Sequence, residues 1–184
     1  AHKFSSGSFT EGRLAAKAAV KYIEDKKAEG IKVSDKQCED FKATVYKPLE
    51  NYTVGQNEIT GGTVSPSYIS PIQGLQRLQR IMDEYVGGIA TNYMTNGNML
   101  KRGLELLAWL EEDLEKVGAE DLHQLMRAWE LKHRTITSQC VTEHTKFRKE
   151  TRWPGYYYRG DHLKLDDENW HCLTVSRRDP ITKE

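Results

Sequence analysis

The sequence contains little cysteine and no long apolar run. Cys38, Cys140 and Cys172 are its three cysteines, and they stand far apart in 184 residues. Without a CxxC pair, neither a zinc ribbon nor a self-contained iron–sulfur site is encoded. Scattered thiols of this kind are typical of a cytoplasmic protein that keeps them reduced. No stretch reaches the roughly 18 apolar residues that a membrane-spanning helix needs, so we expect no transmembrane segment.

The sequence also lacks a net charge, because 27 lysines and arginines balance 27 aspartates and glutamates. A protein that binds nucleic acid or an anionic membrane surface usually carries a basic excess, so we expect neither partner. Hydrophobic residues make up 38% and charged residues 29%, which is typical of a folded domain. A chain of this length can bury roughly 70% of its unfolded surface, which is enough for one core.

The glycines form no nucleotide-binding fingerprint. No GxGxxG is present, and Arg13 follows Gly7 and Gly12 where a P-loop requires lysine and then serine or threonine. The chain alone is therefore not expected to hold the pyrophosphate of a dinucleotide.

No metal site is predicted either. His133 and His144 are 11 residues apart on one predicted helix, which is about 16 Å and too far to share an ion. The carboxylates of Asp166, Asp167 and Glu168 would alternate in direction along an extended segment. Ion pairs with nearby arginines are the favoured role for these acids.

Ser8 to Glu11 matches a capping box, which predicts a helix from Phe9 to near Gly30. The small residues before it allow the backbone to approach a ligand closely. The free amides and the positive dipole end of the helix would suit the pyrimidine edge of a flavin, which becomes anionic on reduction. An ordinary capped helix without a ligand accounts for the same residues.

A second capping box, Ser34 to Gln37, predicts a helix that Pro48 limits. The stretch that follows, to about residue 69, is rich in glycine, serine, threonine and proline and is predicted to be a connector.

Three strongly periodic helices are predicted between residues 70 and 149. Each carries one apolar stripe, and short connections favour antiparallel neighbours in a bundle. The stripes are Leu75, Leu78, Met82, Tyr85 and Ile89; Leu100, Leu104, Leu107, Leu114 and Val117; and Leu122, Met126, Trp129, His133, Ile136, Cys140, His144 and Phe147.

Residues 148–184 have no helical period but contain several tyrosines and tryptophans. We interpret residues 150–184 as an extended aromatic arm that packs on the bundle or on a partner. The predicted fold is therefore mainly α, with an N-terminal helix (1–30), a helix and connector (31–69), a three-helix bundle (70–149) and this arm. The chain has no terminating element at either end, so we expect it to be part of a longer polypeptide.

The order of several motifs resembles one family. HKFSSGSFTEGR near the start, DLHQLMRAWELKHR in the third predicted helix, ETRWPGYYYR and DDENW together resemble the C-terminal part of the alpha subunits of dissimilatory adenylylsulfate reductases. These belong to the flavoprotein superfamily of fumarate reductase, succinate dehydrogenase and L-aspartate oxidase, whose corresponding motif is closer to ESRGAHYR. Glu150 and Arg152 persist here, while residues 153–157 read WPGYY, which favours the sulfur enzyme.

The resemblance implies an activity for the parent protein. It would bind FAD and interconvert adenylylsulfate with sulfite and AMP. Electrons would come from 4Fe–4S clusters in a separate ferredoxin-like beta subunit, and most substrate contacts would lie in the N-terminal remainder of the alpha subunit. Residues 1–30 would then be the last loop and helix of the flavin-binding domain.

The resemblance also implies site residues. A motif that contacts the flavin in the dicarboxylate enzymes matches residues 2–9, so backbone amides of Ser6, Gly7, Ser8 and Phe9 would bind the flavin. Lys3 replaces the arginine that clamps a substrate carboxylate and would offer a point charge to sulfate or sulfite. Two alternatives stay open: a succinate, fumarate or aspartate type of flavoprotein, and a non-catalytic helical domain for subunit assembly.

Overall fold

The computed structural model describes residues 5–26, 30, 32–57, 65 and 67–179. The fold is mainly α, as the sequence predicts. Its elements are, in chain order, α1 (Ser5–Lys26), α2 (Asp35–Asn57), α3 (Pro71–Tyr85), η1 (Ile89–Thr91), β1 (Met94–Thr95), α4 (Gly97–Asp113), η2 (Leu114–Lys116), α5 (Leu122–Phe147), β2 (Tyr158–Arg159) and α6 (Asp167–Trp170). The chain divides into two compact units, residues 1–42 and 43–184.

The first unit holds α1 and the start of α2. The second predicted capping box is confirmed: the Ser34 amide donates to Gln37 Oε1 (2.9 Å) and the Gln37 amide donates to Ser34 Oγ (3.2 Å). These two bonds satisfy donors at the helix start that have no partner within the helix. α1 ends at Lys26, before the predicted end at Gly30, and residues 27–29 lie outside the described ranges.

The prediction that Pro48 limits the second helix is wrong, because α2 runs through it to Asn57. A proline inside a helix disturbs the hydrogen bonds of the preceding turn. The amide that Pro48 lacks would have bonded the carbonyl of Thr44, four residues earlier. The neighbouring carbonyl of Val45 accepts a hydrogen bond from the Trp129 indole over 2.9 Å, which joins α2 to α5. The Pro48 carbonyl in turn accepts the amide of Ala119 (2.8 Å), which fastens this part of α2 to the connection between α4 and α5.

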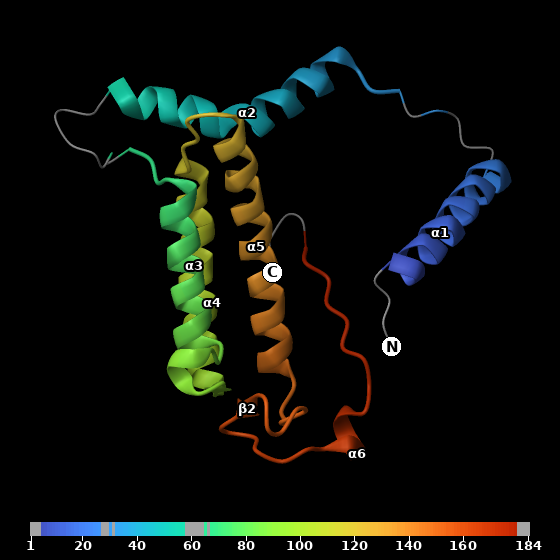
Figure 1. The fold of residues 1–184 in the computed structure, drawn as a ribbon, viewed down its shortest axis with the longest axis vertical. Coiled ribbons are helices and arrows are strands. Elements are labelled where there is room, and N and C mark those ends of the chain that lie inside the picture. Colours follow the sequence, from blue (N-terminus) through green and yellow to red (C-terminus); the bar gives the residue numbers. More distant parts are fainter. Residues whose placement is uncertain (1–4, 27–29, 31, 58–64, 66, 180–184) are drawn as a thin grey trace. The chain divides into compact units, whose positions relative to one another are not determined.

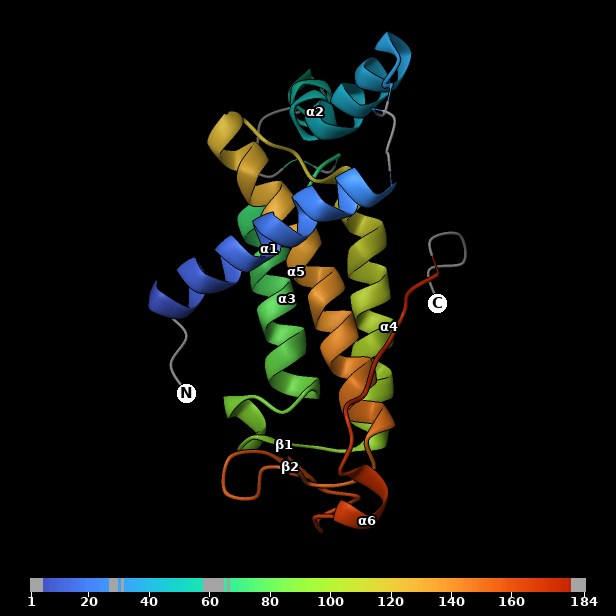
Figure 2. The same cartoon turned by 90° about the vertical axis from the view of Figure 1, so that its right-hand side faces the viewer.

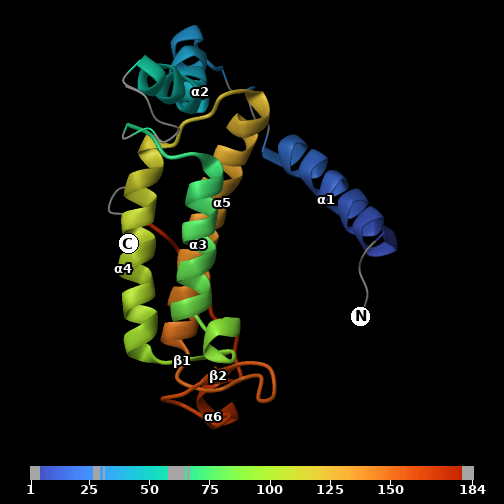
Figure 3. The ribbon, with the colours of Figure 1, turned by 60° about the vertical axis from the view of Figure 1, so that its left-hand side comes forward.

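Helices α3, α4 and α5 run down, up and down beside one another (Figures 1 and 3) and contact each other pairwise. This confirms the predicted antiparallel bundle. Each helix starts at a side-chain cap, which is Ser70 for α3, Asn96 for α4 and Asp121 for α5. Leucines and one isoleucine from all three helices form the core: Leu78, Ile81, Leu107, Leu110, Leu114 and Leu131.

The apolar stripe predicted for the third helix lies on the wrong face. Leu122, Met126, Ile136 and Phe147 are exposed. The residues of α5 that are buried are Leu125, Ala128, Leu131, Thr135 and Thr142. These lie on roughly the opposite side of the helix at 100° per residue, so α5 is apolar on two faces and the bundle covers one of them.

The C-terminal arm closes one end of the bundle (Figure 2). β2 in the arm pairs in parallel with β1, which lies between α3 and α4, with Met94 opposite Tyr158 and Thr95 opposite Arg159. Beyond the four-residue helix α6, the arm is extended over its described part to residue 179. Within the described ranges, no helix combines the length and apolar character needed to cross a membrane.

Candidate functional site

The predicted flavin-contacting segment lies at the start of α1. The helix begins at Ser5, four residues before the predicted start at Phe9, so the interpretation of Ser8 as a helix cap is wrong. The small residues at positions 5–7 adopt helical geometry themselves. In an α-helix the first amides have no acceptor one turn back, and Ser6 and Gly7 lie in this first turn. The amides of Ser8 and Phe9 fall in the following turn, where acceptors within the helix become available. Lys3 lies outside the described residues.

The second candidate site is centred on Glu150, whose exposed fraction is 2%. Arg148 donates to Glu150 Oε1 over 2.7 Å, and Arg152 donates to Oε2 over 2.7 Å. The Asp166 amide adds a third donor at 3.1 Å, and Arg152 also binds Asp167 at 2.6 Å. One buried carboxylate therefore joins the end of α5 to the segment before α6.

The environment of Glu150 favours its charged form. Burial alone would raise the pKa of the Glu150 carboxyl, but hydrogen bonds from Arg148, Arg152 and the Asp166 amide outweigh it and lower that pKa below its usual value. Glu150 is therefore a paired anion at neutral pH. The pKa of the Asp161 carboxyl is lowered for the same reason. Burial would raise it, but hydrogen bonds from Arg159 and from the Gly97 amide outweigh burial.

Arg159 forms the other ionic contact of this region. Its guanidinium binds Asp161 at 3.0 Å and donates to the carbonyl of Arg148 at 2.7 Å and to that of Thr145. Asp161 also accepts the Gly97 amide at 2.8 Å. Because Gly97 begins α4 and Thr145 lies in the last turn of α5, the Arg159–Asp161 pair ties these two helix ends together. The arginine complements the carbonyls at the end of α5, where the dipole is negative.

A cleft of about 830 Å³ lies beside these residues, with Trp153, Tyr157 and Trp170 among its walls. The three arginines of the cleft, Arg148, Arg152 and Arg159, are all engaged by carboxylates or carbonyls of the chain. The arrangement accordingly fixes the arm to the bundle and leaves no arginine of this set unpaired for a ligand.

The sequence predictions for this region have mixed outcomes. Asp167 does pair with an arginine, as expected for the acidic run. His144 contacts Ser176 Oγ at 2.7 Å. Sequence reasoning singled out Glu150 and Arg152 but missed the roles of Arg148 and Arg159. Each pairs with a carboxylate two residues away and also donates to backbone carbonyls of other segments, which the sequence does not indicate.

Residues 75–184 match the family of fumarate reductase flavoprotein C-terminal domains. The match covers more than half of the chain, and the chain belongs to this family.

The chain is similar over its whole length to adenylylsulfate reductase proteins. It is 43% identical to the adenylylsulfate reductase subunit alpha of Megalodesulfovibrio gigas, covering 100% of this chain and 27% of that protein. The structure of adenylylsulfate reductase from Archaeoglobus fulgidus matches all of this chain and 28% of its own, with a TM-score of 0.92 and 55% identity. A structure of adenosine-5-phosphosulfate reductase with sulfite as a covalent adduct matches equally well.

Likeness to the wider superfamily is weaker. The Mycobacterium smegmatis Sdh1 complex matches 76% of this chain with a TM-score of 0.55 and 22% identity. At this identity the likeness shows a shared fold only. The chain thus spans about a quarter of the length of the adenylylsulfate reductases that it matches.

Proposed function

We propose that this chain is the C-terminal part of the alpha subunit of an FAD-dependent adenylylsulfate reductase. The parent enzyme interconverts adenylylsulfate with sulfite and AMP in dissimilatory sulfur metabolism. The observation that carries this proposal is the agreement with adenylylsulfate reductase over the entire chain, at 55% identity and a TM-score of 0.92. The superfamily relative Sdh1 reaches only 22% identity and a TM-score of 0.55, which favours the sulfur substrate over a dicarboxylate.

The start of α1 fits a role in holding the cofactor. The amides of Ser6 and Gly7 lie in the first turn of α1, where a helix offers no acceptor one turn back, and a helix N-terminus carries roughly half a positive charge. Such a site stabilises negative charge that develops on an electron-rich ring oxygen. When bound, FAD supplies the electron transfer, while this chain orients the ring and complements its charge. The amides of Ser8 and Phe9 belong to the same proposed flavin contact, and Lys3 is proposed to offer a point charge to sulfate or sulfite.

The remaining parts of the chain have structural roles in this proposal. Residues 1–30 end the flavin-binding domain, residues 31–69 connect it to the bundle at 70–149, and residues 150–184 form the arm. The N-terminal remainder of the alpha subunit contributes the dinucleotide fold and most contacts to adenylylsulfate. A ferredoxin-like beta subunit with 4Fe–4S clusters exchanges electrons with the flavin, and the complex works in the cytoplasm.

The activity is tested on the full-length alpha subunit co-expressed with its beta subunit. We expect sulfite oxidation that depends on AMP, measured with an artificial electron acceptor. Succinate and aspartate serve as alternative substrates. Turnover with either of these, and none with sulfite and AMP, would assign the protein to the dicarboxylate branch of the superfamily. A complex with no redox activity would favour the role in subunit assembly.

The contact to the flavin is tested with two glycines of α1. Gly7→Leu places a bulky side chain in the first turn of the helix, and we expect loss of bound FAD and of activity. Gly12→Leu is the matched control, because a Cβ at Gly12 meets nothing within 4 Å. Equal FAD content in both variants, read from flavin absorbance per subunit, would contradict the contact. Lys3→Ala should change the kinetics of sulfite and adenylylsulfate while the FAD content stays constant.

A further inference from the structure

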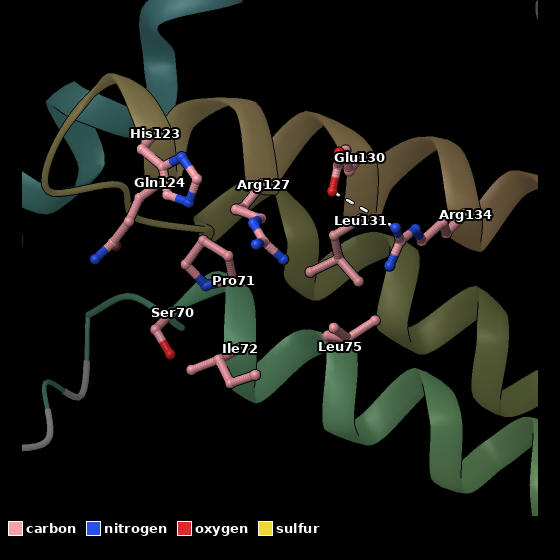
Figure 4. A pocket seen from close by; sticks show the side chains of 10 residues that line it. All are labelled: Ser70, Pro71, Ile72, Leu75, His123, Gln124, Arg127, Glu130, Leu131 and Arg134. Carbon is pink, nitrogen blue, oxygen red and sulfur yellow. Dashed lines mark ion pairs between the residues drawn. The ribbon is translucent and has the colours of Figure 1, made fainter.

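A separate pocket lies between the first turns of α3 and the first half of α5. Its volume is about 340 Å³, which is at the small end of the range for ligand sites. Figure 4 shows side chains of α5 and of α3 facing each other across it. Both walls belong to the same compact unit of the chain.

The floor of the pocket is apolar and closely packed. Pro71 and Leu131 are buried, and Leu75 is half-buried. Gly74 brings α3 against α5, because a Cβ at Gly74 would stand only 2.5 Å from Leu131 Cδ2. The two helices therefore meet directly beside the pocket, and its floor is held by the bundle core to which Leu131 belongs.

The wall contributed by α5 carries more cations than anions. Arg127 and Arg134 line the pocket together with one carboxylate, that of Glu130. Glu130 forms an ion pair with Arg134, in which Glu130 Oε2 and Arg134 Nη2 are 3.6 Å apart. Arg127 has no ion pair or hydrogen bond within the described part of the chain, and Figure 4 shows it standing over the pocket between Pro71 and Leu131. His123, one turn before Arg127, adds a ring nitrogen at the same end of the pocket.

We propose that this pocket binds a compact organic anion, with its acidic group at Arg127 and its apolar body on Pro71, Leu75 and Leu131. A guanidinium binds carboxylate and phosphate oxygens through paired N–H donors. An apolar floor with a few polar groups at one edge is the usual construction of a small-molecule site. Neither the flavin contact nor the adenylylsulfate chemistry proposed above involves these residues.

The chemical requirements of the ligand follow from the lining. A carboxylate or a phosphate would satisfy Arg127, and a flat ring would cover the three apolar side chains. A neutral molecule of the same shape would leave the guanidinium without its partner, so it should bind more weakly. A bulky dinucleotide would not fit in about 340 Å³.

The experiment uses the full-length subunit and the probe 4-iodobenzoate. Crystals soaked with the probe should show iodine in this pocket by its anomalous scattering. In solution we expect saturable binding with a Kd of about 1 mM or below, which is ordinary for so small a ligand. Inorganic phosphate in a competition arm distinguishes a site for any anion from one that also needs the apolar body.

Three comparisons make the result specific. Arg127→Gln should weaken binding about tenfold or more, because it removes a charge-assisted hydrogen bond. Arg80→Gln, on the exposed face of α3 and outside the pocket, should leave the Kd unchanged. The neutral isostere 4-iodobenzamide should bind about as weakly to the native subunit as 4-iodobenzoate binds to the Arg127→Gln variant.

Several outcomes would overturn the proposal. One is iodine located elsewhere, and another is a Kd that Arg127→Gln leaves unchanged. A third is a pocket that another part of the polypeptide, or the beta subunit, fills in the full-length protein. None of these readouts requires turnover, so they are independent of whether the subunit reduces adenylylsulfate.

Discussion

The Tyr157 hydroxyl donates a hydrogen bond to the carbonyl oxygen of Val86, and the two oxygens are 2.5 Å apart. Val86 directly follows α3 and is almost fully buried. Tyr157 belongs to the arm, just before β2. The bond therefore joins two segments that are 71 residues apart in the sequence, next to the place where β1 and β2 pair.

Tyr157→Phe should destabilise the fold by about 1–2 kcal/mol. The substitution keeps the ring but leaves the buried Val86 carbonyl without its donor. Tyr156→Phe is the matched control, because Tyr156 is exposed, and we expect its effect to stay within about 0.5 kcal/mol. Urea unfolding of both variants measures the difference. Equal midpoints would show that the bond contributes nothing.

The same phenol should make stability fall at alkaline pH. Burial raises the pKa of Tyr157 to about 12, against weaker opposing effects of Arg159 and Thr145. The folded state thus holds this proton more tightly than the unfolded state, in which a tyrosine has a pKa of about 10. Its contribution is fully present below about pH 10 and is lost as the pH rises towards about 12. The stability gap between the native protein and Tyr157→Phe should narrow over that range. A gap that stays constant would contradict the shift.

Gly87→Ala should be more destabilising than Gly155→Ala. Both glycines have a φ of 96°, which costs a residue with a Cβ about 1–2 kcal/mol. A Cβ at Gly87 would also lie 2.5 Å from the Tyr157 ring, whereas a Cβ at Gly155 meets nothing within 4 Å. We expect about 1 kcal/mol at Gly155 and about 3 kcal/mol at Gly87, since displacing a packed ring adds a further cost. Thermal unfolding of the two variants provides the comparison.

Glu150→Gln should cost about 3 kcal/mol, the lower end of what breaking a buried ion pair usually costs. The variant leaves Arg148 and Arg152 beside a neutral amide that cannot accept their charge-assisted bonds as well. Asp167→Asn removes only the exposed partner of Arg152 and should cost less than about 1 kcal/mol. If both substitutions had the same small effect in denaturant unfolding, Glu150 would not be the centre of the network.

Acid should act on the same carboxylate. The pKa of Glu150 is lowered in the folded state, so its contribution is present above the unfolded pKa and is lost as the pH falls through the folded pKa. The free energy of unfolding should therefore decrease below about pH 4.5, the range in which an ordinary glutamate titrates. Glu150→Gln should flatten this part of the profile. An unchanged acid profile in the variant would assign the loss to other carboxylates.

Local signals in the sequence were enough to predict the bundle. Three apolar periods between residues 70 and 149 predict the three helices, and local caps such as Asn96 for α4 fix where they begin. The box at Ser34 is confirmed because both of its hydrogen bonds are local. The box at Ser8 failed because the same residue types also occur inside a helix, and nothing local stops α1 from starting at Ser5.

Contacts between distant segments could not be predicted in this way. The carbonyl of Val45, in the turn of α2 before Pro48, accepts a hydrogen bond from Trp129, which is 84 residues away. Arg159 acquires its partners from the end of α5 and from the start of α4 through Asp161. Charge pairs of this kind depend on which helix ends meet, and the order of residues in one segment carries no information on that.

The face of α5 is the clearest case of an ambiguous pattern. Thr135 and Thr142 are fully buried, although threonine carries a hydroxyl and counts as polar when an apolar stripe is sought in the sequence. Each hydroxyl donates to a carbonyl one turn earlier, that of Leu131 (2.9 Å) or Ser138 (2.7 Å), so the polar group is satisfied inside the helix. The larger apolar residues of α5 lie on the exposed face. The prediction chose that face because it weighed apolar size alone.

Two leucines of α5 provide a direct test of this assignment. Leu125 is 7% exposed and Leu122 is 68% exposed, so replacing each by alanine removes the same atoms from very different surroundings. We expect Leu125→Ala to cost about 2–4 kcal/mol, from lost burial and a remaining cavity. Leu122→Ala should cost less than about 0.5 kcal/mol in the 184-residue chain. Denaturant unfolding of that chain measures both, and the reverse order would restore the face predicted from the sequence. Repeating Leu122→Ala in the full-length subunit separates a free surface from a covered one, because a loss that appears only there would mean that another part of the polypeptide packs on this face.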